Sequence, residues 1–153
     1  MEQRAAHGDR QIATSPDHQI DVVYPLRWER GRPVPFPTIY WLKPGELHRA
    51  VANLERQGLI AELEERIQND ASFRDAVHDD HRRYIAQRWA MLTEDDRTAV
   101  EEFGLREHFH ERGIAGIADF NHVKCLHAHV AHALADRNLI GQHIQAQVDR
   151  LTK

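Results

Sequence analysis

The chain has 153 residues, of which 41% are hydrophobic and 29% charged, and this is the composition of a globular protein rather than a disordered one. Its formal net charge of -4 provides no basic surface for a phosphate backbone, so nucleic-acid binding is not expected. There is no secretory signal and no apolar run long enough to span a membrane, and the single cysteine cannot form an internal disulfide, so we expect a cytoplasmic protein.

The first third of the chain is expected to hold the strands. Residues 1–18 show no periodicity and are expected to form a mobile tail, followed by a single globular domain over residues 19–153. All six prolines lie between Pro16 and Pro44. β-Branched and aromatic residues at 20–24 and 38–42 predict two strands, and Arg30-Gly31-Arg32-Pro33 predicts a turn between them. We expect an antiparallel hairpin whose second strand begins after Pro37 or runs along an edge.

The remainder of the chain has apolar residues at helical spacing. The pattern predicts helices over 44–57, 59–69, 71–92 and 94–103, with Gly58 ending the first and Thr93 capping the last of these. An alanine-rich segment after residue 122 and an amphipathic one ending near Leu151 predict two more. The predicted fold class is α+β and mostly α, with an N-terminal β-hairpin packed on a bundle of about six helices.

Residues that bind metals or act as nucleophiles gather between His122 and His132. Cys125 is followed by His127, His129 and His132. On a helix turning by about 100° per residue, His122, Cys125, His129 and His132 share an arc of about 80°, and His127 points away from them. Thiolate and imidazole suit zinc, copper or iron better than magnesium or calcium. The sequence therefore predicts a transition-metal site, with zinc as the expected metal, Cys125, His129 and His132 as core ligands, and His122 or His127 completing or supporting the site.

Other interpretations of the same segment stay open. If residues 123–130 formed a strand, Cys125, His127 and His129 would share one face, although the alanine content favours a helix. Near a helix N-terminus, the dipole together with Lys124 and His129 would lower the pKa of Cys125 and make it a nucleophile or a redox sensor.

The chemistry that follows depends on which interpretation holds. A metal with an open position would support metal-assisted hydrolysis. The residues with catalytic potential are Cys125, Lys124 and His127. The remaining alternative is a non-catalytic helical interaction protein whose Cys/His cluster is internal packing. The sequence identifies no partner and is compatible with a homo-oligomer. The scattered histidines, among them His48 and His81, are expected to be solvated.

Two phrases of the sequence resemble a known family. One is Phe36-Pro37-Thr38-Ile39-Tyr40-Trp41-Leu42 followed by Pro44, and the other runs from Gly113-Ile114-Ala115-Gly116-Ile117 into Val123-Lys124-Cys125-Leu126-His127-Ala128-His129. They resemble the bacterial domain-of-unknown-function family numbered 501, and Asn53-Leu54-Glu55 and Gly58-Leu59-Ile60 also fit its pattern.

The family is uncharacterised, so the resemblance implies a small cytoplasmic bacterial protein and no reaction. Its distinctive residues in this chain would be Lys124, Cys125, His127, His129 and His132. The sequence departs from the family at Lys43, where relatives often have a cysteine before the proline, so a site with two cysteines is not expected.

Overall fold

The structure is a computed structural model that describes residues 11–17 and 19–152. Five short strands come first in the chain: β1 (Gln11–Thr14), β2 (Ile20–Val23), β3 (Leu26–Glu29), β4 (Arg32–Pro35) and β5 (Tyr40–Leu42). The helices of the described residues follow: α2 (Glu46–Arg56), α3 (Leu59–Asn69), α4 (Ala71–Met91), α5 (Glu94–Glu102), α6 (Arg106–His110), the short 3-10 turn η2 (Ile114–Gly116), α7 (Leu126–Ala135) and α8 (Leu139–Leu151). The fold is α+β and mostly α, as the sequence predicts.

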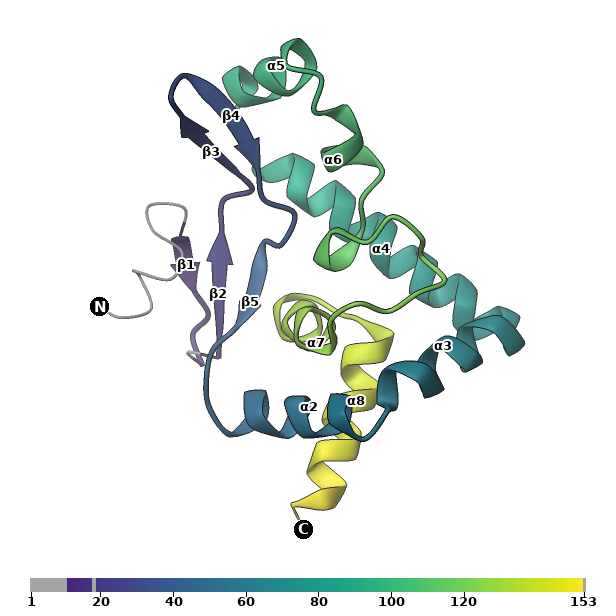
Figure 1. The fold of residues 1–153 in the computed structure, drawn as a ribbon. Helices are drawn as coiled ribbons and strands as arrows, with labels where there is room; N and C mark the ends of the chain where they lie inside the picture. The colour runs from purple at the N-terminus through teal and green to yellow at the C-terminus, as the bar shows by residue number, and fades with distance from the viewer. Residues whose placement is uncertain (1–10, 18, 153) are drawn as a thin grey trace.

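The two predicted strands pair, but they do not form a simple hairpin. β2 and β5 are antiparallel, with Asp21 opposite Trp41. The chain between them forms a second antiparallel pair, β3–β4, which turns at Arg30 and Gly31, both with positive φ. Prolines are tolerated in β4 because a two-stranded ribbon leaves one side of each strand without a ladder to complete. The prediction of one hairpin is therefore corrected to two small sheets, β1-β2-β5 and β3-β4 (Figure 1).

β1 lies within the stretch that was expected to be a mobile tail. It pairs antiparallel with β2, with Ala13 opposite Val22. The expectation of a tail therefore does not hold for Gln11–Thr14. The sequence did not reveal this strand, because four residues are too few to show a clear period-2 pattern. Residues 1–10 and 18, which complete the expected tail and include His7 and His18, lie outside the described residues.

Helix α7 lies at the centre of the structure. It packs against β5 on one side, α8 crosses it on another, and α2 also contacts it (Figure 1). The main core joins buried residues of these helices with those of α3 and α4, including Leu54, Ile67, Val77, Val130 and Ile144. No helix in the part of the chain that the structure describes is long and apolar enough to cross a membrane.

The start of α7 differs from the starts of its neighbours. The predicted cap at Thr93 is confirmed, since its side chain accepts a hydrogen bond from the Asp96 N–H at the start of α5. At α7 the residue before the helix is Cys125, which has an extended backbone (φ -142°, ψ 114°) and makes no such bond across the first turn. The helix thus begins at Leu126, and the expectation of one helical face that includes His122 and Cys125 is wrong.

Candidate functional site

Cys125 is held at the point where the chain enters α7. The backbone N–H of Leu126 donates to Glu55 Oε1 at 2.9 Å, so a carboxylate from α2 satisfies one of the free donors of this helix end. The backbone N–H of Ala128, in the first turn of the helix, acts on the thiol and lowers its pKa. A negative charge on either group is favoured at this position, because the helix dipole is positive at its N-terminus.

His127 lies in the first turn of α7 and is fixed by a carbonyl group. Its Nε2 is 3.0 Å from the carbonyl oxygen of His48, which can only accept, so Nε2 carries a proton and donates it to this bond. Its Nδ1 lies 3.5 Å from Glu55 Oε1. In a neutral imidazole this assignment leaves the lone pair on Nδ1, on the side of the ring that faces Glu55. The His48 ring packs on the same imidazole, with 4.0 Å between the ring centroids.

Three side chains converge on one point. One ligand atom from each of Glu55, Cys125 and His127 lies within 4.8 Å of the other two. Among the described residues, these are the His, Cys, Asp or Glu side chains that bring three ligand atoms this close together. All three side chains are partly buried, so the group is reachable without being freely solvated.

The charges of this group are coupled. Burial raises the pKa of the Cys125 thiol, but the hydrogen bond from His127 and the influence of the Ala128 N–H outweigh it, and the pKa of Cys125 is lowered. The hydrogen bond to Cys125 in turn raises the pKa of His127, against the effect of burial. Thiolate and imidazolium therefore stabilise each other. The Glu55 carboxylate acts in the opposite sense on the thiol, because two neighbouring negative charges repel.

A small cavity of about 240 Å³ opens beside Cys125 and His127. Its other walls come from four elements or their flanks, and include Thr38, Tyr40, Trp41, His48, Ala115 and Ala128. Among the described residues that line it there is no Lys, Arg, Asp or Glu. Ala115 has φ 59°, in the left-handed region that costs energy for any residue with a Cβ, and such strain is often found at functional sites.

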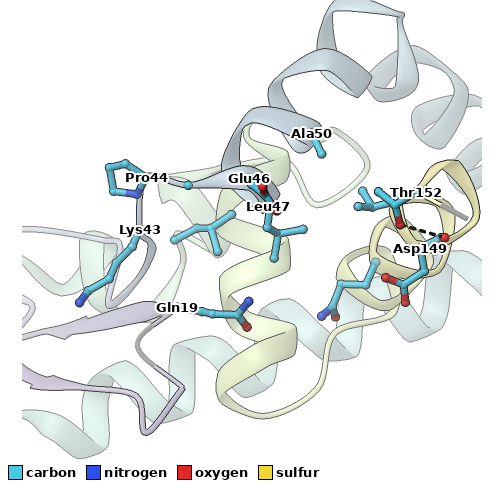
Figure 2. Close-up of a pocket in the computed structure, with 12 residues that line it drawn as sticks. Gln19, Lys43, Pro44, Glu46, Leu47, Ala50, Asp149 and Thr152 are labelled. Carbon is cyan, nitrogen blue, oxygen red and sulfur yellow. Dashed lines mark hydrogen bonds between the residues drawn. The ribbon is translucent and has the colours of Figure 1, made fainter.

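A larger cavity of about 500 Å³ lies elsewhere, between the start of α2 and the end of α8. Figure 2 shows Gln19 and Leu47 on one side of it, and on the other Asp149 of α8 and Thr152, which follows that helix. The Thr152 hydroxyl donates to the Asp149 carbonyl oxygen at 3.1 Å. The described residues that line this cavity include neither a cysteine nor a histidine. We therefore place the candidate site at the smaller cavity, where a thiol and two imidazoles lie together.

The predicted ligands His129 and His132 lie in the core, where they bond to Asn138. His129 Nδ1 is 3.3 Å from Asn138 Oδ1, and His132 Nδ1 is 3.1 Å from Asn138 Nδ2. The second nitrogen of His132 is 3.2 Å from Gln87 Oε1. Burial lowers the pKa of His129 to about 4 and that of His132 to about 3, so both are neutral near pH 7. The structure does not bring these two side chains together with Cys125.

The predicted residues on the N-terminal side of Cys125 are exposed. His122 lies at the surface, 3.2 Å from Glu64 Oε2 and 3.5 Å from Asp119 Oδ2. Lys124 is exposed as well. Neither of these two described residues lines the cavity beside Cys125. His127, which was expected to point away from Cys125, contacts it, because the helical angle between them has no meaning when Cys125 precedes the helix.

Sequence reasoning missed two members of the site, Glu55 and His48. Both lie on α2, about two turns of helix apart, and no spacing rule links them to residue 125. His48 was expected to be solvated, yet it is partly buried and lines the cavity. His81, expected to be solvated too, is fully buried, and its Nδ1 accepts a hydrogen bond from the Ile114 N–H at 3.0 Å.

Comparisons with known proteins agree with the resemblance seen in the sequence. A family model described as "Protein of unknown function (DUF501)" matches residues 13–146, which is nearly the whole chain. No curated protein matches the chain significantly. No solved structure matches it significantly either. The match covers all four residues of the site, and it brings no reaction with it.

Proposed function

The chain belongs to the DUF501 family of proteins of unknown function, and we propose that it binds a transition metal through Glu55, Cys125 and His127, with zinc as the expected metal. This ligand set shares only Cys125 with the core ligands expected from the sequence. In this set His127, which the sequence analysis expected to complete or support the site, is a ligand. Glu55 is the third ligand, and the buried His129 and His132 are not ligands.

The observation that carries the proposal is the convergence of the three ligand atoms within 4.8 Å. In a tetrahedral zinc site the ligand atoms lie 2.0–2.3 Å from the metal, and hence roughly 3–4 Å from one another. Small rotations of the three side chains would close the present arrangement around an ion. The donor set of one thiolate, one imidazole and one carboxylate also suits zinc better than magnesium or calcium.

The hydrogen bond from His127 to the His48 carbonyl supports the same proposal. Metal-binding histidines commonly donate their second ring N–H to a carbonyl or carboxylate, which fixes the ring and leaves the other nitrogen for the metal. His127 donates from Nε2, and its Nδ1 faces Glu55. The ring is thus already in the orientation that a ligand at Nδ1 requires.

Charge balance gives a third line of support. Glu55 and an ionised Cys125 bring two negative charges close together, and burial and the Glu55 carboxylate both oppose ionisation of the thiol. A divalent cation between them would neutralise both charges and favour the thiolate. The partly buried position of the thiol makes such compensation more valuable than it would be in water.

Three protein ligands would leave a fourth position open. Cys125 and His127 line the small cavity and Glu55 does not, so the open side faces the cavity. A zinc ion in an open site polarises a carbonyl group and activates water. The reaction class we propose is hydrolysis, in which the oxygen of water bonds to the carbonyl carbon, the bond to the leaving group breaks, and the leaving group departs with a proton.

The test is metal analysis of the protein purified without chelators, beside variants of each ligand. We expect about one zinc ion per chain. Cys125→Ser, His127→Ala and Glu55→Gln should each weaken the affinity by at least about tenfold. Cobalt substitution gives an independent readout, because a cobalt–thiolate bond adds a near-ultraviolet absorption band that Cys125→Ser should abolish. His122→Ala and Glu62→Gln, at exposed positions, are matched surface controls, and both should retain the metal.

A His129→Ala/His132→Ala double variant separates the two ligand sets. We expect the folded fraction of this variant, measured by circular dichroism, to bind the metal as the unmodified chain does. Loss of metal in the folded double variant, with full retention in Glu55→Gln, would contradict our ligand set and favour the set expected from the sequence. Unchanged affinity in Cys125→Ser would contradict a metal site at this position altogether.

One observation favours a second function, a metal-free reactive thiol. Cys125 sits at the N-terminus of α7, where the Ala128 N–H and His127 both lower its pKa, and these are the surroundings that stabilise a thiolate. The protein purified for metal analysis also tests this second function. If it is metal-free and Cys125 is a reactive thiol, iodoacetamide should alkylate Cys125 at neutral pH faster than it alkylates free cysteine. Slow alkylation together with no metal leaves the non-catalytic interaction protein, in which the cluster is packing.

A further inference from the structure

We infer that the cavity beside Cys125 and His127 is a substrate recess for one uncharged group about the size of an aromatic ring. The substrate class is a small molecule that carries this group next to a hydrolysable carbonyl. The inference rests on the proposed metal site and adds to it the kind of molecule that the site accepts.

The chemistry of the walls selects against charged groups. Tyr40 and Trp41 contribute aromatic surface, and the small side chains of Ala115 and Ala128 leave the space between them. None of the described residues that line the cavity is Lys, Arg, Asp or Glu. Once the proposed metal occupies Cys125 and His127, a charged substituent would lose its hydration without gaining an ionic partner from the other walls, whereas an apolar group would gain from leaving water.

The volume sets the size of the group. An apolar cavity of roughly 150 Å³ is known to hold benzene, and a water molecule takes up roughly 30 Å³ in the liquid. A cavity of about 240 Å³ has room for one ring and a short linkage, and falls below the range of sites for drug-sized ligands, which begins near 300 Å³.

The recess is held in shape by the core behind it. The Tyr40 ring stacks on the His132 ring, with 5.8 Å between centroids and 9° between planes. It also meets the Tyr84 ring edge-on at 5.7 Å, and Tyr84 is fully buried. Buried neighbours on two sides restrict the rotation of Tyr40, so this wall does not have to be ordered when a ligand enters.

The position of the recess relative to the ligands gives its role. Cys125 and His127 form part of its wall, and Glu55 approaches them from outside it. A carbonyl group at the open position of the metal would thus place its substituent in the recess. The aromatic walls would then orient the substrate, and the metal ligands would act on its carbonyl.

Two hydroxamates test the inference in the cobalt-loaded protein. Benzohydroxamate and acetohydroxamate chelate a metal through the same atoms and differ in a phenyl or methyl substituent. We expect benzohydroxamate to bind at least about tenfold more tightly, because its ring is buried in the recess. The affinity is read from the change in cobalt absorption on titration.

Variants locate the effect. Trp41→Ala, at a partly exposed wall position, should remove most of the preference for the phenyl compound, and Trp28→Ala is a matched control far from the cavity that should keep it. Ala128→Leu should fill the recess and weaken benzohydroxamate while acetohydroxamate binds as before. Cobalt content and circular dichroism are measured for each variant, so loss of fold is not mistaken for loss of the recess.

The outcomes separate the two proposals. A protein that takes up cobalt through Cys125 but binds both hydroxamates equally would overturn the recess and leave the metal site intact. A preference that survives in Trp41→Ala and in Ala128→Leu would also overturn it, since the ring would then lie elsewhere. A protein that takes up no cobalt overturns the metal site, and this inference with it.

Discussion

At the scale of single residues, the side chain of Asn138 contacts two buried histidines and also caps a helix. It is 1% exposed, and its Oδ1 accepts from the Gly141 N–H at 2.8 Å, which caps α8. The same oxygen lies 3.3 Å from His129 Nδ1, and its Nδ2 donates to His132 Nδ1. One amide therefore fixes the tautomers of two buried histidines: Nδ1 carries the proton in His129, and Nδ1 holds the lone pair in His132.

Replacing Asn138 by alanine should destabilise the fold strongly. The lost helix cap costs about 1 kcal/mol, and the buried groups left without partners cost about 1–3 kcal/mol more. We expect the free energy of unfolding, measured by urea denaturation, to fall by about 2–4 kcal/mol. Asn121→Ala, at an exposed asparagine, is the control and should change it by less than about 0.5 kcal/mol. A loss below about 1 kcal/mol in Asn138→Ala would show that water replaces the amide.

The residue scale is also where sequence reasoning about the site was least complete. The sequence placed Cys125 and His127 in the candidate site, since clustering of thiol and imidazole is visible in a single chain. It did not predict Glu55, because a carboxylate on α2 meets Cys125 only through the packing of α2 against α7. The helical angles calculated from the sequence were wrong because they assumed a helix that includes His122 and Cys125. The helix begins at Leu126, whose backbone N–H is bound by Glu55.

At the scale of elements, α7 and α8 cross at close range. A Cβ built on Gly141 would overlap the His129 carbonyl group and lie 2.7 Å from the Ala133 Cβ. The backbone of α8 can approach α7 this closely because glycine has no side chain. The crossing holds α7 between α8 and β5, and so sets where its N-terminus, with Cys125, lies.

Gly141→Ala should therefore destabilise the protein, although alanine favours a helix by about 1 kcal/mol over glycine. The clash is with backbone atoms that cannot rotate away, and overpacking of this kind costs typically 1–3 kcal/mol or more. We expect a net loss of about 1–3 kcal/mol in urea denaturation. Gly45→Ala is the control, because a Cβ there meets nothing within 4 Å and its backbone is extended. A more stable Gly141→Ala variant would mean that the two helices can move apart at no cost.

Element boundaries were predicted well where local signals set them. Thr93 and Gly58 mark helix ends in the sequence and in the structure, because caps act within one turn. The β3–β4 ribbon was not predicted, since Pro33 and Pro35 argue against a strand and only a ribbon with open edges accepts them. The pairing of β2 with β5 was predicted from the residue types in the two segments, but the β3–β4 pair in the chain between them was not.

At the scale of the whole molecule, buried polar groups join distant parts of the chain. The guanidinium of Arg88, on α4, is fully buried and donates to the carbonyl oxygens of Pro37, Phe109 and Arg112. Burial lowers its pKa to about 10, so it keeps its charge near pH 7. One cation thus ties the segment before β5 to α6 and to the loop that follows it. No local pattern reveals such a role, because it depends on three carbonyl groups from separate segments.

Three buried histidines should make the whole fold sensitive to mild acid. Burial lowers the pKa of His81 to about 2, that of His132 to about 3 and that of His129 to about 4, whereas an unfolded histidine has a pKa near 6.5. Below pH 6.5 these three histidines are therefore protonated in the unfolded chain but stay neutral in the folded chain. Stability is then fully present above pH 6.5 and falls as the pH falls toward 4. His127, whose pKa is raised, works in the opposite direction, but it is one group against the three, and the lowered pKa values of His48 and His110 act together with the three.

We expect the free energy of unfolding to fall by several kcal/mol between pH 7.5 and pH 5.0, at up to about 1.4 kcal/mol per pH unit for each of the three histidines. Urea denaturation at a series of pH values measures this slope. His129→Gln should reduce the slope by about a third, since one of three refused protons is removed, and His122→Gln, at an exposed histidine, should leave it unchanged. If stability were flat from pH 7.5 to 5.0, the three imidazoles would have to be protonated within the fold, and the Asn138 bonds described above could not all persist.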